Sequence, residues 1–194
     1  MIASLHGKME SLGSDRAIIN VGGVGFQVFM PTSTLSTLGA SGSEVHLHTH
    51  LHLREDNATL YGFSSADELG LFQILISVSG LGPRLALALL SAMSIEQLAI
   101  AITTGSVDLL TNVSGIGKKM ANRLIVELKD KIGTGWITAT AAQVAQENTE
   151  VLAALTSLGY SVSEATRAVA TLPPASDLAL EEKLKLALQY FGGK

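Results

Sequence analysis

The chain has 194 residues, of which 47% are hydrophobic, and its 13 basic and 17 acidic side chains give a formal net charge of −4. The hydrophobic content is sufficient for packed cores, so the composition indicates a globular protein and excludes a disordered one. There is no cysteine, which excludes disulfides and thiolate metal sites. The longest apolar run, Leu85 to Leu90, is far shorter than the roughly 20 residues of a membrane span. The N-terminus lacks the pattern of a signal peptide, so we expect a cytoplasmic protein without a membrane segment.

Residues 1–63 have the pattern of short β-strands. Alternating or β-branched and aromatic stretches occur at Asp15–Val21, Gly25–Pro31, Glu44–Leu53 and Ala58–Phe63, separated by clusters of Gly, Ser and Asn. Five short strands in this length favour a small closed barrel, because closure removes exposed sheet edges.

The rest of the chain is predicted to be helical and to form separate domains. Residues 64–132 begin with a capping box, Ser65 followed by Glu68, and contain further helix starts at Pro83, Ser94, Ser106 and Gly117. Residues 133–148 are rich in Gly, Thr, Ala and Gln without a period and are predicted to be a flexible linker. Residues 149–194 are predicted to form three short helices. The predicted fold class is multidomain α+β.

An internal repeat is the strongest signal in the sequence. The stretch SGLGPRLALALL begins at Ser79, and SGIGKKMANRLIVEL begins at Ser114, 35 residues later. Each copy reads Ser-Gly-apolar-Gly-x-basic and leads into a helix. Two glycines allow a sharp turn that brings backbone N–H groups close to an anion, and the helix adds unpaired donors and the positive end of its dipole. Two such sites suit the phosphates of the two strands of a duplex.

Positive charge is concentrated beside the second copy of the repeat. Ser114–Lys131 carries five basic and two acidic residues although the whole chain is acidic. A basic side chain also follows the first copy, and such cations add attraction for phosphate. The residues predicted to bind DNA are Ser79, Gly80, Gly82, Arg84, Ser114, Gly115, Gly117, Lys118, Lys119 and Arg123.

The repeat does not match the common nucleotide-binding motifs. A Walker A loop needs a glycine and a Ser or Thr where Asn112 and Lys119 stand, and neither GGVGF nor GLGPRL has the third glycine of a dinucleotide-binding fingerprint. One copy alone is equally well explained as an ordinary turn between helices with solvated lysines. Two copies, each followed by a basic residue, favour phosphate binding.

The repeat resembles the tandem helix-hairpin-helix module, which holds DNA phosphates through the backbone of Gly-apolar-Gly turns. The flanking stretches LHLREDNATLYGF, LFQILISVSGLGPRLALALLSAM, GIGKKMANRLIVELKDK and ALTSLGYSVSEA extend the match, and the chain as a whole resembles the RuvA family of Holliday-junction-binding proteins. The resemblance implies an OB-like barrel at residues 1–63, a tandem helix-hairpin-helix domain at residues 64–132 and a three-helix, UBA-like domain at residues 149–194.

The resemblance also implies function and partners. The expected function is sequence-independent recognition of four-way DNA junctions, which are held open and flat for branch migration in recombination and repair. The expected partners are the hexameric ATPase RuvB, the RuvC resolvase and further copies of the chain in a homotetramer or octamer. No cofactor, metal or catalytic residue is expected. The chain departs from the family pattern at Ser114, where proline is frequent, and at Arg84, where lysine is frequent.

Two acidic residues, Glu55 and Asp56, fall in the short turn REDNAT between two predicted strands. Taken alone they indicate a solvated turn, because Asp and Asn favour turns. In the RuvA family this hairpin is an acidic pin at the centre of a fourfold assembly. The resemblance therefore implies that Glu55 and Asp56 repel phosphates at the crossover.

Four histidines, His46, His48, His50 and His52, alternate along one predicted strand and share one of its faces. The simplest interpretation is a solvent-facing or subunit-facing surface. Imidazoles at this spacing also bind transition metals, so the alternative function is a structure-specific, metal-dependent nuclease or hydrolase that uses this strand. A general duplex-binding adaptor without preference for junctions is a third possibility.

The C-terminal stretch ALTSLGYSVSEATRAVATL resembles the RuvA domain that contacts RuvB. Leu155, Leu158 and Tyr160 are candidates for this contact, although each is more easily explained as part of a small core.

Overall fold

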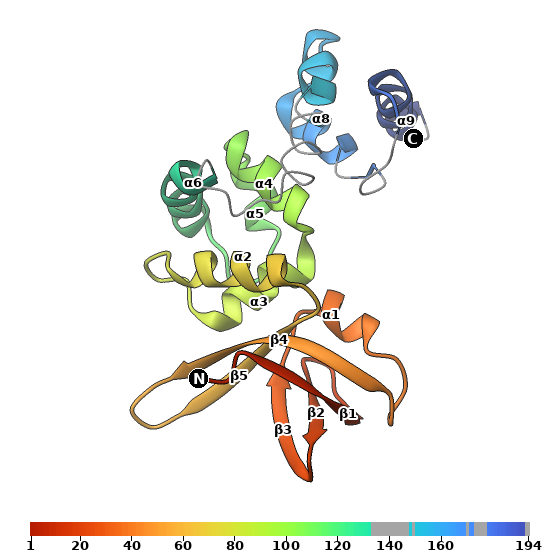
Figure 1. Ribbon diagram of the computed structural model, residues 1–194. Coiled ribbons are helices and arrows are strands. Elements are labelled where there is room, and N and C mark those ends of the chain that lie inside the picture. The colour runs from red at the N-terminus through yellow and green to blue at the C-terminus, as the bar shows by residue number, and fades with distance from the viewer. Residues whose placement is uncertain (133–147, 149, 170, 173–177, 193–194) are drawn as a thin grey trace. The chain divides into compact units, whose positions relative to one another are not determined.

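The computed structural model describes residues 1–132, 148, 150–169, 171–172 and 178–192 (Figure 1). The chain divides into two compact units, Met1–Ala92 and Met93–Lys194, and each is described by itself. The predicted linker, residues 133–148, lies outside the described residues except at residue 148, which is helical. No single helix among the described residues is long and apolar enough to span a membrane. Helix α3 (Pro83–Ala92) has the length and composition of a span only together with residues Gln97–Thr103 of α4 (Ile95–Thr103), and this pair is bent.

Unit 1 begins with the predicted barrel. Its strands close in the order β1-β2-β3-β5-β4, and all neighbours are antiparallel except β3 and β5. The strands are β1 (Ser4–Leu12), β2 (Arg16–Val21), β3 (Val24–Phe29), β4 (Glu44–Leu53) and β5 (Ala58–Phe63).

The barrel core follows the alternation of the strands. Leu5, Met9, Val45 and Leu47 are buried in one cluster, so the residues between them on β1 and β4 face outward. A short helix that the sequence did not predict, α1 (Thr32–Thr37), follows β3.

The carboxylate of Glu68 connects the start of the first long helix to the short helix α1. Helix α2 (Ala66–Ile76) begins where predicted, with the Ser65 side chain accepting a hydrogen bond from the Glu68 N–H. The Glu68 carboxylate accepts from the Ser64 N–H at 3.0 Å and from the hydroxyl of Thr34 in α1 at 3.0 Å. It therefore connects α1 to the start of α2, and α3 comes next in the chain.

Unit 2 starts with three helices, α4, α5 (Val107–Thr111) and α6 (Lys118–Ile132). The predicted starts at Ser94 and Ser106 are confirmed as N-caps, and Ser94 forms a complete capping box with Gln97. The fully buried side chains of these helices include Leu98, Ile102, Leu110, Leu124 and Leu128.

The C-terminal helices of unit 2 pack around a small core, in which Ile100 of α4 also takes part. Residues 150–157 are helical, and α8 (Val162–Val169) and α9 (Leu180–Gly192) come after them. The buried residues include Val151, Leu155, Ala165, Val169 and Ala187. Tyr160 stacks on Phe191 with ring centroids 4.1 Å apart and planes at 14°, which ties the end of the first of these helices to α9.

Candidate nucleic-acid interface

The first predicted turn connects α2 to α3 through one residue with a left-handed backbone. Gly80 has a φ of 85°, a value that residues with a Cβ rarely adopt. The Leu81 N–H donates to the Val78 carbonyl at 3.0 Å, and the Gly82 carbonyl accepts from the Ala86 N–H at 3.1 Å. Val78 and Leu81 are buried. The apolar residue between the glycines therefore anchors the turn in the core, as the sequence predicted.

The second turn, between α5 and α6, repeats this geometry. Gly115 has a φ of 88°. The Ile116 N–H donates to the Val113 carbonyl at 3.0 Å, and the Gly117 carbonyl accepts from the Ala121 N–H at 3.0 Å. Each of these features lies 35 residues after its counterpart in the first turn, so the sequence repeat is also a repeat of backbone structure.

Several backbone donors at the two turns are available to a ligand. Within the part of the chain that the structure describes, the N–H groups of Gly80, Gly82, Gly115 and Gly117 donate to no acceptor of the protein. Gly80, Gly115 and Gly117 are exposed, and Gly82 is half-buried. The first-turn N–H groups of α6 also lack intrahelical partners, whereas in α3 Pro83 has no N–H and the Leu85 N–H donates to the Gly82 carbonyl at 3.0 Å. Each turn therefore offers a set of donors at the positive end of a helix.

The second glycine of each turn is not required by the fold. Gly82 and Gly117 do not have a left-handed φ, and a Cβ built on either would meet no other atom within 4 Å. An alanine would therefore fit at both positions in the protein alone. What the absence of a side chain provides is room for an external group to approach the backbone closely.

The cations beside the two turns differ in number. Arg84 is exposed in the first turn of α3, whereas Lys118 and Lys119 are both exposed at the start of α6. Arg123 is half-buried, and its Nε lies 3.9 Å from Oε1 of Glu127. Ser79 and Ser114, which precede the glycines, are exposed.

The two predicted acidic residues lie at the tip of the hairpin formed by β4 and β5. The Arg54 N–H donates to the Asn57 carbonyl at 2.8 Å and closes the turn. Glu55 and Asp56 are exposed between them. The Arg54 Nε donates to His52 Nε2 at 3.3 Å, so one cation is held at the base of an otherwise acidic tip.

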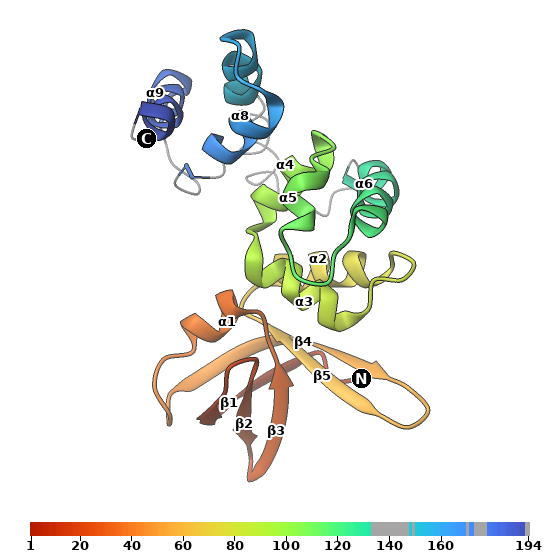
Figure 2. The same cartoon turned by 180° about the vertical axis from the view of Figure 1, so that it is seen from behind.

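The hydroxyl of Tyr61 on β5 is influenced by cations of the hairpin and of the helix after the first turn. Burial raises the pKa of its hydroxyl, and this rise is opposed by a hydrogen bond with Thr59 and by the charges of Arg84 and Arg54. The two guanidinium groups therefore act on the same side chain, one from the first turn and one from the hairpin. Both views of unit 1 show the α2–α3 turn on the same side as the hairpin tip (Figures 1 and 2).

The outward histidine face of β4 divides into two halves. His46 is exposed and His48 half-buried, whereas His50 packs against Phe72 of α2 with ring centroids 5.5 Å apart. Among the described residues, His50 Nδ1 is the one buried side-chain polar atom without a hydrogen-bond partner. Burial, and secondly the neighbouring His52, lower the pKa of His50. The covered half is therefore a packing surface for α2.

Sequence reasoning missed His6, because nothing near it in the sequence connects it to β4. Strand pairing places His6 of β1 directly opposite His46. Across the described ranges, no group of three or more His, Asp or Glu side chains is placed to hold a metal ion in the conformations found.

The three candidate partner-binding residues of the C-terminal helices have different environments. Leu155 is completely buried, which leaves it a role in packing only. Tyr160 is half-buried on Phe191. Leu158 is 59% exposed and is the member of the set with apolar surface available to another protein.

Comparison with known proteins matches the three parts of the chain in order. The family described as RuvA N terminal domain matches residues 1–62, the SAM-like Helix-hairpin-helix tandem matches residues 72–130, and the RuvA C-terminal domain matches residues 146–191.

Relatives named "Holliday junction branch migration complex subunit RuvA" align over nearly the whole chain. Those from Dehalococcoides mccartyi and Chloroflexus aggregans are 50% and 47% identical, covering 100% and 99% of both chains. The relative from Delftia acidovorans is 44% identical and covers 97% of this chain and 98% of its own. With its closed barrel, its two equivalent Gly-apolar-Gly turns and these full-length matches, the chain belongs to the RuvA family.

Proposed function

We propose that this chain binds four-way DNA junctions without reading base sequence and acts as the DNA-binding subunit of a branch-migration complex. The observation that carries the proposal is the pair of equivalent turns, whose second glycines, Gly82 and Gly117, leave open space that the fold itself does not need. The relatives are named as Holliday junction branch migration complex subunits, which supports a four-way junction as the ligand.

Phosphate is the part of DNA that these turns suit. Backbone N–H groups and the helix dipole attract an anion but carry no information about bases. The exposed side chains of Arg84, Lys118 and Lys119 add charge that releases counterions from DNA, so binding weakens as salt rises. A turn that binds phosphate in this way gives affinity without sequence preference.

The acidic hairpin tip would act by repulsion. Glu55 and Asp56 are exposed at the end of a two-stranded projection, and like charges exclude phosphates from their vicinity. A tip of this kind at the centre of a junction would keep the crossing strands apart while the turns hold the arms. It requires no bond-breaking chemistry, and we propose that the chain is not itself an enzyme.

The symmetry of the ligand sets the proposed assembly. One copy offers two related turns, which suit the two strands of one duplex arm, so four arms require four copies. We propose a homotetramer, with an octamer formed by two tetramers as the alternative. Exposed Leu158 in the C-terminal helices would contact the hexameric RuvB ATPase, and RuvC is a further candidate partner on the assembled junction.

A gel-shift assay tests the proposal against its alternatives. The full chain is titrated into a synthetic four-way junction and into linear duplexes of the same sequences, with Mg²⁺, Mn²⁺ or Zn²⁺ in parallel lanes. The proposal predicts a stable shift of the junction at lower protein concentration than the duplexes, and intact DNA in every lane. Equal affinity for duplex would favour a general adaptor, and cleavage would favour a nuclease, which the comparisons do not support.

A further inference from the structure

The exposed half of the histidine face extends across two strands. In the β1–β4 pairing, His6 lies opposite His46, and Ser4 lies opposite His48. The residues that alternate with them, Leu5 and Leu47, are in the barrel core, so the three imidazoles share the outer surface. His6 and His46 are exposed, and His48 is half-buried.

The imidazole rings lie at separations that suit a shared metal ion. The ring centroids of His46 and His48 are 5.3 Å apart, and those of His6 and His46 are 6.2 Å apart. With metal–nitrogen bonds of about 2.0–2.1 Å, two imidazoles on one tetrahedral ion have ring centroids roughly 5 Å apart. His46 is the central residue, because it neighbours both of the others.

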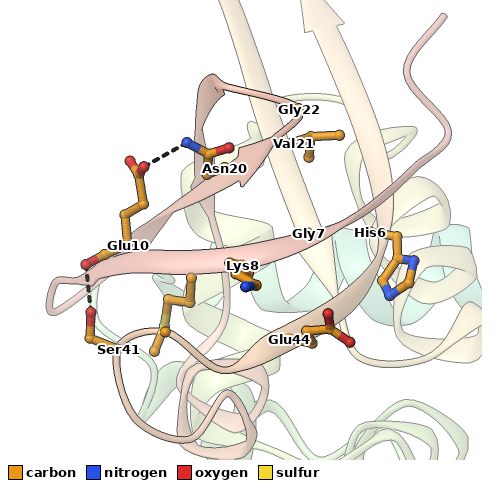
Figure 3. A pocket seen from close by; sticks show the side chains of 11 residues that line it. His6, Gly7, Lys8, Glu10, Asn20, Val21, Gly22, Ser41 and Glu44 are labelled. Atoms are coloured by element: carbon orange, nitrogen blue, oxygen red, sulfur yellow. Dashed lines mark hydrogen bonds between the residues drawn. The ribbon is translucent and has the colours of Figure 1, made fainter.

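One of the three histidines borders an open hollow on the surface. His6 borders a surface hollow with Lys8 and Glu44, and the labelled side chains show these three groups near one another (Figure 3). Lys8 is paired with Glu44 in the strand register, so the carboxylate of this hollow stands opposite a lysine in the sheet. The remaining histidines of the strand, His50 and His52, lie toward the aromatic cluster at α2 and do not extend the site.

The rings do not converge on one point in the conformations found, so sharing one ion requires the side chains to rotate. His6 and His46 are exposed, and exposed side chains change rotamer within nanoseconds. The backbone, which is the part that does not adjust, already holds the two residues opposite each other on paired strands.

We propose that His46 and His48, joined by His6, bind one divalent late transition-metal ion of the Zn²⁺, Ni²⁺ and Cu²⁺ class on the outer face of the barrel. Imidazole is a preferred ligand of these ions, and water completes the coordination. Such an ion joins β1 to β4, so it stabilises the folded barrel by an amount that grows with the logarithm of the free ion concentration once that exceeds the dissociation constant. Within unit 1 the site is separate from the α2–α3 turn and from the hairpin tip, and it does not depend on DNA binding.

Calorimetric titration of the full chain, produced without a polyhistidine tag, with Zn²⁺ tests this site. We expect one ion per chain and a rise in the melting temperature with added Zn²⁺. His46→Gln should weaken zinc binding by more than about tenfold, because losing a ligand costs at least as much as losing the group that orients it. His48→Gln should do the same, and His6→Gln should weaken binding less and lower the thermal shift by a correspondingly smaller amount.

The matched control is His52→Gln, on the same face of the same strand, which should leave zinc affinity unchanged. Melting curves without metal establish that each variant is folded. Absence of saturable zinc binding by the folded chain would overturn the proposal. It would also be overturned by an equal loss in His52→Gln and His46→Gln, or by half an ion per chain, which would indicate a site between copies.

Discussion

The turn at residues 78–82 and the turn at residues 113–117 share their backbone hydrogen bonds, their left-handed glycine and their buried apolar anchor. They differ in the first residues of the helix that each turn leads into. Pro83 opens α3, is buried, and has no N–H to offer, whereas Lys118 opens α6 with an exposed ammonium and a free N–H. The first turn of α3 carries one exposed cation, and the first turn of α6 carries two.

This difference separates two contributions to phosphate binding. The backbone geometry is common to both copies, so it is the part of the repeat that defines the site. The charge is unequal, so the second turn should contribute more to affinity and more to the salt dependence. Variants that change one contribution and leave the other intact can test both statements.

The largest effect is expected from breaking the second turn itself. Gly115→Val places a β-branched residue at a φ of 88°, which costs about 1–2 kcal/mol or more and displaces the donors at Gly117. Thermal unfolding should show the lost stability, and junction affinity should fall by at least about a hundredfold because several charge-assisted hydrogen bonds are lost together. If a folded Gly115→Val protein bound the junction with wild-type affinity, the left-handed turn at Gly115 would not be needed for binding.

Removing one cation from each turn sharpens the comparison of charge. Lys118→Ala should lower junction affinity several-fold and reduce the slope of log affinity against log salt by about 0.9. Arg84→Ala should act in the same direction. Lys129→Ala is the control, since Lys129 is also exposed on α6 but lies three turns away from its start. Lys129→Ala should keep the wild-type slope. If Lys118→Ala and Arg84→Ala also kept it, neither turn would be contacting phosphate through its cation.

Neutralising the hairpin tip tests whether attraction is confined to the turns. The double change Glu55→Gln and Asp56→Asn removes two negative charges from an exposed tip. We expect junction affinity to stay the same or to rise by up to a few-fold, because repulsion from phosphate is relieved. Titration of a fluorescent junction measures this, and a large loss of affinity would show that the carboxylates make favourable contacts instead.

The smallest expected effect is a pH dependence of stability that comes from His50, which packs against the helix before the first turn but has no counterpart at the second. His50 packs beneath α2, the helix that leads into that turn, and burial lowers its pKa below the ordinary value of 6.5. The unfolded chain therefore binds a proton at this residue more readily than the folded chain does. The contribution of His50 to stability is complete above pH 6.5 and is lost as the pH falls through the lowered pKa. Melting temperatures of wild type and His50→Leu between pH 7.5 and 5 should show a weaker pH dependence in the variant, and parallel curves would contradict this.

Local sequence signals predicted much of this structure because they act over a few residues. The N-caps at Ser65, Ser94 and Ser106 and the two Gly-apolar-Gly turns depend on neighbours within one helical turn. The individual strands of the barrel were predictable from alternation and spacing for the same reason.

Features that depend on contacts between distant segments were not predictable in this way. The pairing of His6 with His46 results from strand register, and the connection of Glu68 to Thr34 joins residues 34 positions apart. Leu155 and Leu158 look alike in the sequence, yet the first is fully buried and the second is 59% exposed, because helix packing decides which side faces the core.

The central claim is that the open space at the second glycine of each turn is occupied by a DNA phosphate, and the double variant Gly82→Ala, Gly117→Ala tests it most directly. Neither position has a left-handed φ or a neighbour within 4 Å of the new methyl group, so the melting temperature should not fall. Gly70→Ala, inside α2 and equally unobstructed, is the matched control. Junction titrations should show at least about a tenfold loss for the double variant, the equivalent of one charge-assisted hydrogen bond, and none for the control. A double variant that binds the junction as tightly as wild type would contradict the account.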